Sequence, residues 1–209
     1  MQLLHLGDLE LTLPLAAAAG AWMLAARAWR PAGAWVLLYS GVIALVGGSK
    51  IAYLGWGLDI AMLDFKAFSG HAAGVTAVYP VLGYLLCRPA GRRCALAAAG
   101  TGLALGLAMA VALVGQEEHA FAEAATGWLL GAAASVGTVC QAERHATYRS
   151  TDQAEPRGVV PGPAAAVCAV AVFFASAWLM QSAHVGYWMI RLAMVLSGNA
   201  QPYSWDTCG

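Results

Sequence analysis

Three short motifs in this 209-residue chain combine residue types that can transfer a phosphoryl group. They are Lys50, the tripeptide Ser69-Gly70-His71, and His119 with Glu123 four residues further on. Histidines serve as nucleophiles, bases and acids, a carboxylate can orient them, and cationic side chains stabilise developing negative charge. Two histidines, a lysine and a carboxylate therefore supply the groups that phosphoryl transfer requires.

His119 and Glu123 form a specific pair. On a helix, residues four apart share one face. A carboxylate bonded to one imidazole nitrogen fixes the tautomer and leaves the other nitrogen as nucleophile or base. Glu123 stands in an otherwise apolar run, where an ionisable residue is costly and usually functional. The alternative for His119 is an interfacial histidine without a chemical role.

Ser69-Gly70-His71 comes directly before another apolar run. The unpaired N–H groups at a helix start attract anions, and Gly70 lets a ligand approach the backbone closely. The tripeptide therefore outlines a phosphate cradle, or alternatively an N-cap serine beside an interfacial histidine. Lys50 would add a cation, or would alternatively be a lysine whose amine extends to the membrane surface.

Composition indicates where these motifs lie. The chain is 60% hydrophobic and 11% charged, with a mean hydropathy of +0.65, which is typical of an integral membrane protein. A spanning helix needs about 20 mostly apolar residues. We expect an all-α polytopic membrane protein that forms a single transmembrane helical domain over residues 1–209. Its six spans are expected near 9–26, 34–54, 70–87, 95–114, 122–140 and 164–183.

The basic residues predict an orientation. The loops at 27–33, 88–94 and 141–163 hold eight of the eleven Lys and Arg residues, although the net charge is zero. Such loops face the cytoplasm under the positive-inside rule. Both termini and the three motifs are then expected on the periplasmic or extracellular face of a bacterial-type inner membrane. The first run opens with the acidic Asp8 and Glu10, so we expect a retained helix rather than a removable signal peptide.

Two segments fall outside the expected spans. Residues 148–163 contain three prolines and read as a cytoplasmic linker. Residues 185–196 are too short to span, and either continue the sixth helix or form an interfacial helix with Tyr187 and Trp188 at headgroup level. The five cysteines make no disulfide framework, because four lie toward the cytoplasmic side and Cys208 stands alone.

The motifs carry a resemblance to a known family. Phe68-Ser69-Gly70-His71-Ala72-Ala73 resembles the second signature of the type 2 phosphatidic acid phosphatase superfamily, Pro-Ser-Gly-His. Lys50 resembles the lysine that opens the first signature of this superfamily. His119-Ala120-Phe121-Ala122-Glu123 resembles the end of the third, His-x-x-x-Asp. The order of the motifs and their placement agree with the six-helix integral members.

This resemblance implies roles for the residues. His119 would be the nucleophile that forms a phosphohistidine, Glu123 its orienting acid, and His71 the general acid. Lys50, Ser69 and Gly70 would bind the phosphate. Phosphoryl transfer depends mainly on positioning and charge stabilisation, so no metal or other cofactor is expected.

The chain departs from the signatures at four places. Gly57-Leu58 stands where the first signature has Arg-Pro, and Leu113 stands where the third has arginine. Phe68 replaces proline, and Glu123 replaces aspartate. Charge-assisted phosphate contacts are strong, so the missing arginines predict weaker binding or a different substrate, unless Lys66 or Arg191 substitutes.

We therefore expect a lipid phosphatase that hydrolyses a phosphate or diphosphate from a lipid head group, with an isoprenyl diphosphate or a phosphatidyl phosphate as candidate substrates. Transfer of the phosphoryl group to another lipid is a close variant. Two alternatives come from other classes: a non-catalytic lipid-binding or transport relative, and a haem or metal protein that uses His71, His119 or His184. No glycine-rich nucleotide loop or basic nucleic-acid patch is present, so no nucleic-acid partner is expected. The sequence implies no particular oligomeric state.

Overall fold

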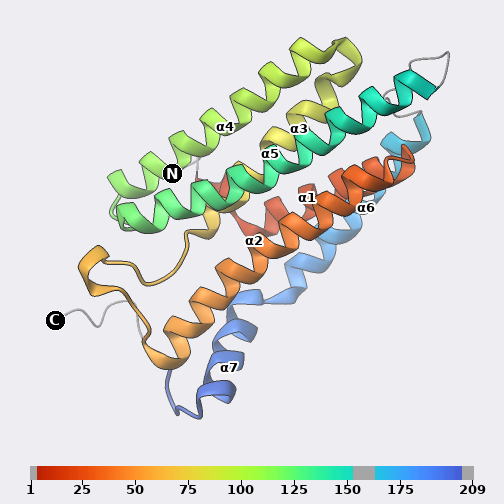
Figure 1. Cartoon of the computed structure of the whole chain (residues 1–209). Helices are drawn as coiled ribbons and strands as arrows, with labels where there is room; N and C mark the ends of the chain where they lie inside the picture. The colour runs from red at the N-terminus through yellow and green to blue at the C-terminus, as the bar shows by residue number, and fades with distance from the viewer. Residues whose placement is uncertain (1–3, 153–162, 204–209) are drawn as a thin grey trace.

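Seven α-helices account for most of the residues that the structure, a computed structural model, describes, which are 4–152 and 163–203 (Figure 1). No β-strand occurs among these residues. The helices are α1 (Leu9–Ala25), α2 (Trp29–Trp56), α3 (Gly70–Cys87), α4 (Arg92–Gly115), α5 (Phe121–Asp152), α6 (Pro163–Ala183) and α7 (Val185–Ser197). Short 3₁₀ turns lie at η1 (Leu4–Gly7), η2 (Ala61–Leu63) and η3 (Arg88–Ala90).

Four of the described helices are long and apolar enough to cross a membrane. They are α2, α3 together with η3, α4 and α6. Two more, α1 and α7, are apolar but shorter, with 17 and 13 residues. Since about 20 residues are needed to cross the hydrocarbon core, the helices give the chain the build of a membrane protein.

Two helices extend beyond the apolar runs that predict them. Helix α2 begins at Trp29 rather than near residue 34. Pro31 is compatible with this early start, because it falls in the first turn, where the missing N–H removes no intrahelical hydrogen bond. Helix α5 continues to Asp152, so the prediction of a linker from residue 148 is wrong for residues 148–152. The polar residues after 140 end the apolar run of α5, but the helix itself continues through them. Residues 153–162 and Cys208 lie outside the described part of the chain.

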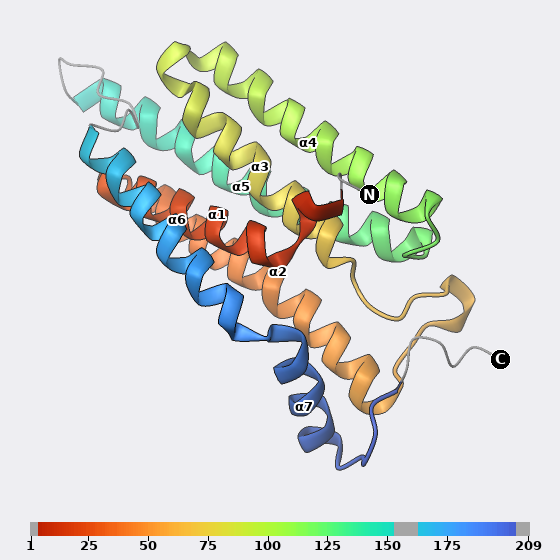
Figure 2. The ribbon, with the colours of Figure 1, turned by 180° about the vertical axis from the view of Figure 1, so that it is seen from behind.

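The helices form two groups that pack side by side, with α3, α4 and α5 in one and α1, α2 and α6 in the other (Figures 1 and 2). Close contacts at glycines bring α3 against its neighbours. A Cβ on Gly131 of α5 would lie 2.5 Å from the carbonyl oxygen of Ala73, and one on Gly102 of α4 would lie 2.5 Å from the backbone nitrogen of Pro80. Small residues permit this approach between apolar helices.

The bundle has two distinct ends. The α1–α2 and α3–α4 turns lie at one end, together with the last turns of α5 and the start of α6 (Figure 1). The α2–α3 loop, the α4–α5 turn and α7 lie toward the other end. His184 adopts a left-handed conformation with φ of 44° and ends α6, so α7 does not continue that helix. Helix α7 packs instead on the last turns of α2, where Ala193 lies against Gly55.

Candidate functional site

His119 and Glu123 form a hydrogen-bonded pair where α4 turns into α5. Glu117, with φ of 57°, reverses the chain, and α5 then begins at Phe121 with Glu123 in its first turn. His119 Nδ1 lies 2.7 Å from Glu123 Oε2. The two side chains are only 17% and 6% exposed. The predicted contact is present, but His119 lies in the turn before α5, so the two side chains meet across the helix start and not along one helix face.

The second oxygen of Glu123 is bound by the α2–α3 loop. Oε1 accepts hydrogen bonds from the backbone N–H groups of Lys66 at 2.8 Å and Ala67 at 3.1 Å. The backbone N–H of Ser69 also donates to the Glu123 carbonyl oxygen at 3.2 Å. Backbone donors stabilise an ionised carboxylate. The carboxylate therefore accepts Nδ1–H from His119, and Nε2 is the imidazole nitrogen left for chemistry.

A cavity of about 530 Å³ surrounds this pair. It is lined by Lys50 of α2, Lys66 of the loop, and the pair itself. Asp64, Glu117 and Glu118 also line it, and these three residues are exposed. The cavity can therefore offer two ammonium groups to an anion beside the His119 imidazole, while three exposed carboxylates also line it.

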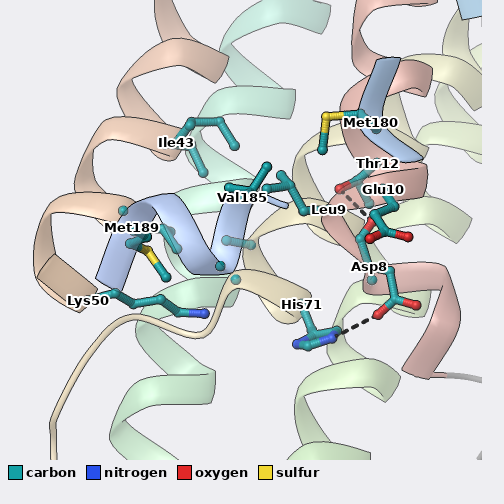
Figure 3. A pocket seen from close by; sticks show the side chains of 18 residues that line it. Asp8, Leu9, Glu10, Thr12, Ile43, Lys50, His71, Met180, Val185 and Met189 are labelled. Carbon is teal, nitrogen blue, oxygen red and sulfur yellow. Dashed lines mark hydrogen bonds and ion pairs between the residues drawn. The ribbon is translucent and has the colours of Figure 1, made fainter. Parts of the chain in front are cut away.

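A second cavity of about 530 Å³ contains His71 and adjoins the first at Lys50, which lines both (Figure 3). A Cβ on Gly70 would lie 3.8 Å from Lys50 Nζ, so the ammonium stands beside the start of α3. The remaining polar lining comes from Asp8, Glu10 and Thr12, and the apolar wall consists of Leu9, Val42, Ile43, Val46, Met180, Val185 and Met189.

Two residues from the predicted set lie apart from the cavities. Ser69 is fully buried at the N-cap of α3, where its Oγ accepts from the backbone N–H of Ala72 at 3.4 Å. It lines neither cavity. Arg191 is exposed on α7, with its guanidinium carbon 5.6 Å from the centre of the Trp188 ring and Nη1 3.5 Å from the Tyr187 hydroxyl. It also lines neither cavity, whereas Lys66 lines the first one.

Sequence reasoning missed Asp8 as a partner of His71. Asp8 Oδ1 lies 3.1 Å from His71 Nε2, and Oδ2 lies 3.1 Å from His5 Nδ1 (Figure 3). The two residues are 63 positions apart, so no local spacing could indicate the pair. The available signal was a carboxylate at the start of an apolar helix, where charge is uncommon.

Metal donors do not gather in the described part of the chain. No three His, Cys, Asp or Glu side chains there are placed to hold one ion. His119 pairs with the carboxylate of Glu123, and His71 pairs with that of Asp8, which also contacts His5. These pairs suit proton transfer and nucleophilic attack.

The protein is therefore helical, with the build of a membrane protein, and has two histidine–carboxylate pairs. One pair lies in each of the two cavities that share Lys50. No family model and no solved structure matches the chain. A curated relative from Klebsiella pneumoniae, named "Uncharacterized 22.5 kDa protein in cps region", is 37% identical over 118 residues. The match covers 56% of this chain and 56% of the relative, so the chain spans about half the length of that protein.

Proposed function

We propose that this protein is an integral membrane lipid phosphatase that removes a phosphate or diphosphate from a lipid head group through a phosphohistidine at His119. The observation that carries the proposal is the His119–Glu123 pair, in which Nδ1 is bound at 2.7 Å and Nε2 remains for attack. Lys50 and Lys66 line the same cavity. Their charges can stabilise the phosphoryl oxygens in the transition state.

The residues support a two-step reaction. A phosphate ester at Lys50 would meet His119 on one side and His71 on the other, since Lys50 lines both cavities. His119 Nε2 attacks phosphorus while the bond to the leaving oxygen breaks, and His71 donates a proton to that oxygen. Water then attacks the phosphohistidine, which releases phosphate and restores His119, and its proton returns to His71. Glu123 remains ionised and holds the His119 ring throughout.

The proposed substrate is a lipid because the site adjoins apolar surface. The cavity at His71 is walled by aliphatic and methionine side chains from α2, α6 and α7. An isoprenyl diphosphate and a phosphatidyl phosphate both combine a phosphate with an apolar tail. Transfer to a second lipid instead of to water would use the same residues, and analysis of the products separates the two reactions.

We further propose six membrane spans, α1 to α6, with α7 at the interface and the site on the periplasmic or extracellular face of a bacterial-type inner membrane. The arginines of the α1–α2 and α3–α4 turns support this orientation, because they lie at the end of the bundle away from the α4–α5 turn (Figure 1). The bacterial relative agrees with such a membrane.

The test is phosphate release by the purified protein in detergent, without added metal, from phosphatidic acid, phosphatidylglycerol phosphate and undecaprenyl diphosphate. We expect release from at least one lipid, loss of release in His119→Ala, and full release in His184→Asn. His184 is the matched control, because it is an exposed histidine that lines neither cavity, and asparagine tolerates its left-handed backbone. Folded wild-type protein that releases phosphate from none of the three would refute the proposal.

A further inference from the structure

Asp8 stands at the N-cap of α1 but its side chain makes no capping hydrogen bond. An aspartate at this position usually accepts from the backbone N–H two or three residues on. Here the carboxylate instead points away from its own helix, toward His71 (Figure 3). Its two oxygens each lie 3.1 Å from an imidazole nitrogen, Oδ1 from His71 Nε2 and Oδ2 from His5 Nδ1.

The backbone on both sides of Asp8 is fixed in place. A Cβ on Gly7 would lie 2.8 Å from His71 Cβ and 2.9 Å from His71 Cα, so only glycine fits there without displacement. The Tyr79 hydroxyl donates to the Leu6 carbonyl oxygen at 3.3 Å, and the Thr12 hydroxyl donates to that of Asp8 at 3.0 Å. These contacts hold the backbone that carries Asp8 beside His71.

This contact has a chemical consequence for His71. An ionised carboxylate can only accept, so the proton shared with Asp8 belongs to His71 Nε2. The exchangeable position is then Nδ1, on a ring that lines the cavity containing Lys50. To act as a general acid from Nδ1, the ring must carry a proton on both nitrogens, and Asp8, which accepts Nε2–H, leaves Nδ1–H as the proton that is given to the leaving oxygen.

We propose that Asp8 is a positioning residue for His71. The Asp8 carboxylate accepts the hydrogen bond from His71 Nε2–H and thereby makes Nδ1 the nitrogen that donates a proton to the ligand. The proposal rests on the lipid phosphatase function proposed above. In that reaction Nδ1–H gives its proton to the leaving oxygen as the phosphorus–oxygen bond breaks, and Nδ1 regains a proton from the water that attacks the phosphohistidine. Asp8 itself does not touch the substrate.

Glu10 offers a matched control for Asp8. It lines the same cavity and carries the same charge two residues further on. In the described part of the chain it makes no hydrogen bond or ion pair with His71. Glu10→Gln therefore changes the charge of the cavity without disturbing the contact on which the proposal depends.

The direct test is the tautomer of His71 in the full chain. With ¹⁵N-labelled histidine in detergent micelles, the His71 signals are assigned by their loss in His71→Gln and recorded at a pH where the ring is neutral. We expect the wild-type protein, Asp8→Glu and Glu10→Gln to hold the proton on Nε2. Asp8→Ala should populate both tautomers, and so should Asp8→Asn, whose amide can either accept from or donate to Nε2 while preserving size.

Kinetics provide the second arm. We expect Asp8→Ala to lower kcat for phosphate release by about tenfold or more, with a much smaller change in KM, and Asp8→Glu to recover part of the loss. A wild-type ring protonated on Nδ1, an unchanged tautomer in both folded Asp8 variants, or an equal loss of kcat in Glu10→Gln would overturn the proposal. Failure of the phosphatase function appears separately, as absent release by wild-type protein, and the tautomer arm then still decides whether Asp8 controls His71.

Discussion

At the scale of single residues, Glu123 connects the parts of the site. Its carboxylate accepts from His119 Nδ1 and from the backbone N–H groups of Lys66 and Ala67, and its own carbonyl accepts from Ser69 N–H. The side chain is almost completely buried. One carboxylate thus orients the His119 ring and also holds the loop that carries Lys66 beside the cavity.

Replacing Glu123 by glutamine should therefore impair catalysis strongly. If the glutamine oxygen keeps the Lys66 and Ala67 N–H groups, its NH₂ faces His119 Nδ1, which must then accept, so the ring proton moves to Nε2 and that nitrogen can no longer attack. We expect kcat to fall by about 10²-fold or more, measured as the initial rate of phosphate release. Glu118→Gln is the matched control, since Glu118 lines the same cavity but is exposed. Equal kcat losses in the two variants would contradict the assigned role.

The three exposed carboxylates that line the His119 cavity should oppose phosphate binding. Asp64, Glu117 and Glu118 face the space that Lys50 and Lys66 would offer to an anion. For the double variant Glu117→Gln/Glu118→Gln we expect KM to fall by about two- to fivefold with kcat unchanged, because exposed charge interactions are worth up to about 1 kcal/mol each. The effect should shrink at 0.5 M salt. A raised KM would instead mean that these acids help to hold the substrate.

At the scale of elements, glycines set the distance between α3 and α5. A Cβ on Gly127 would lie 2.5 Å from the Ser69 carbonyl oxygen, which belongs to rigid backbone. Gly127→Ala should therefore separate the helices next to Glu123 and destabilise the protein by about 1–3 kcal/mol. The measurement is thermal unfolding in detergent by circular dichroism. Gly100→Ala, in α4 with nothing within 4 Å of its Cβ position, should leave the melting temperature unchanged or raise it.

The elements also show what the sequence could predict. The apolar runs located the helices, and the spacing of His119 and Glu123 predicted their contact, although His119 lies in the turn before α5 and not within the helix. The length of α5 did not follow from the sequence. The polar residues at 141–152 indicate that this segment leaves the apolar environment, but they do not indicate whether its backbone remains helical. The contacts of Glu123 with the α2–α3 loop and of Asp8 with His71 join residues more than 50 positions apart. Only the packing of helices brings such residues together, and no local pattern encodes it.

At the scale of the whole molecule, Glu143 joins three helices at the end of the bundle opposite the site. Glu143 of α5 accepts from the Tyr84 hydroxyl at 2.7 Å and from Arg92 Nε, and lies 3.8 Å from Arg88 Nη2. Burial raises the pKa of Glu143, but the hydrogen bonds from Tyr84 and Arg92 and the charges of both arginines outweigh it, so its pKa lies below the ordinary 4.5. This network ties α3, α4 and α5 together.

A lowered pKa predicts how stability depends on pH. The contribution of Glu143 is fully present above its unfolded pKa of about 4.5 and is lost as the pH falls through the folded value. Between pH 6 and pH 3.5 we expect the melting temperature to decrease more in the wild-type protein than in Glu143→Gln. Glu118→Gln, which removes an exposed carboxylate, should follow the wild-type curve. Parallel curves for wild type and Glu143→Gln would show that the network does not stabilise the fold.

The two ends of the molecule should lie on opposite sides of the membrane, with the arginine-rich turns in the cytoplasm. Cysteine labelling can test this in intact bacterial cells that express a variant without its five native cysteines. Met62 is 97% exposed on the α2–α3 loop, so Met62→Cys should react with a membrane-impermeant maleimide. Restored Cys94, which is exposed in the first turn of α4, should react only after permeabilisation. The reverse pattern would place the His119 site in the cytoplasm and exclude substrates of the outer leaflet.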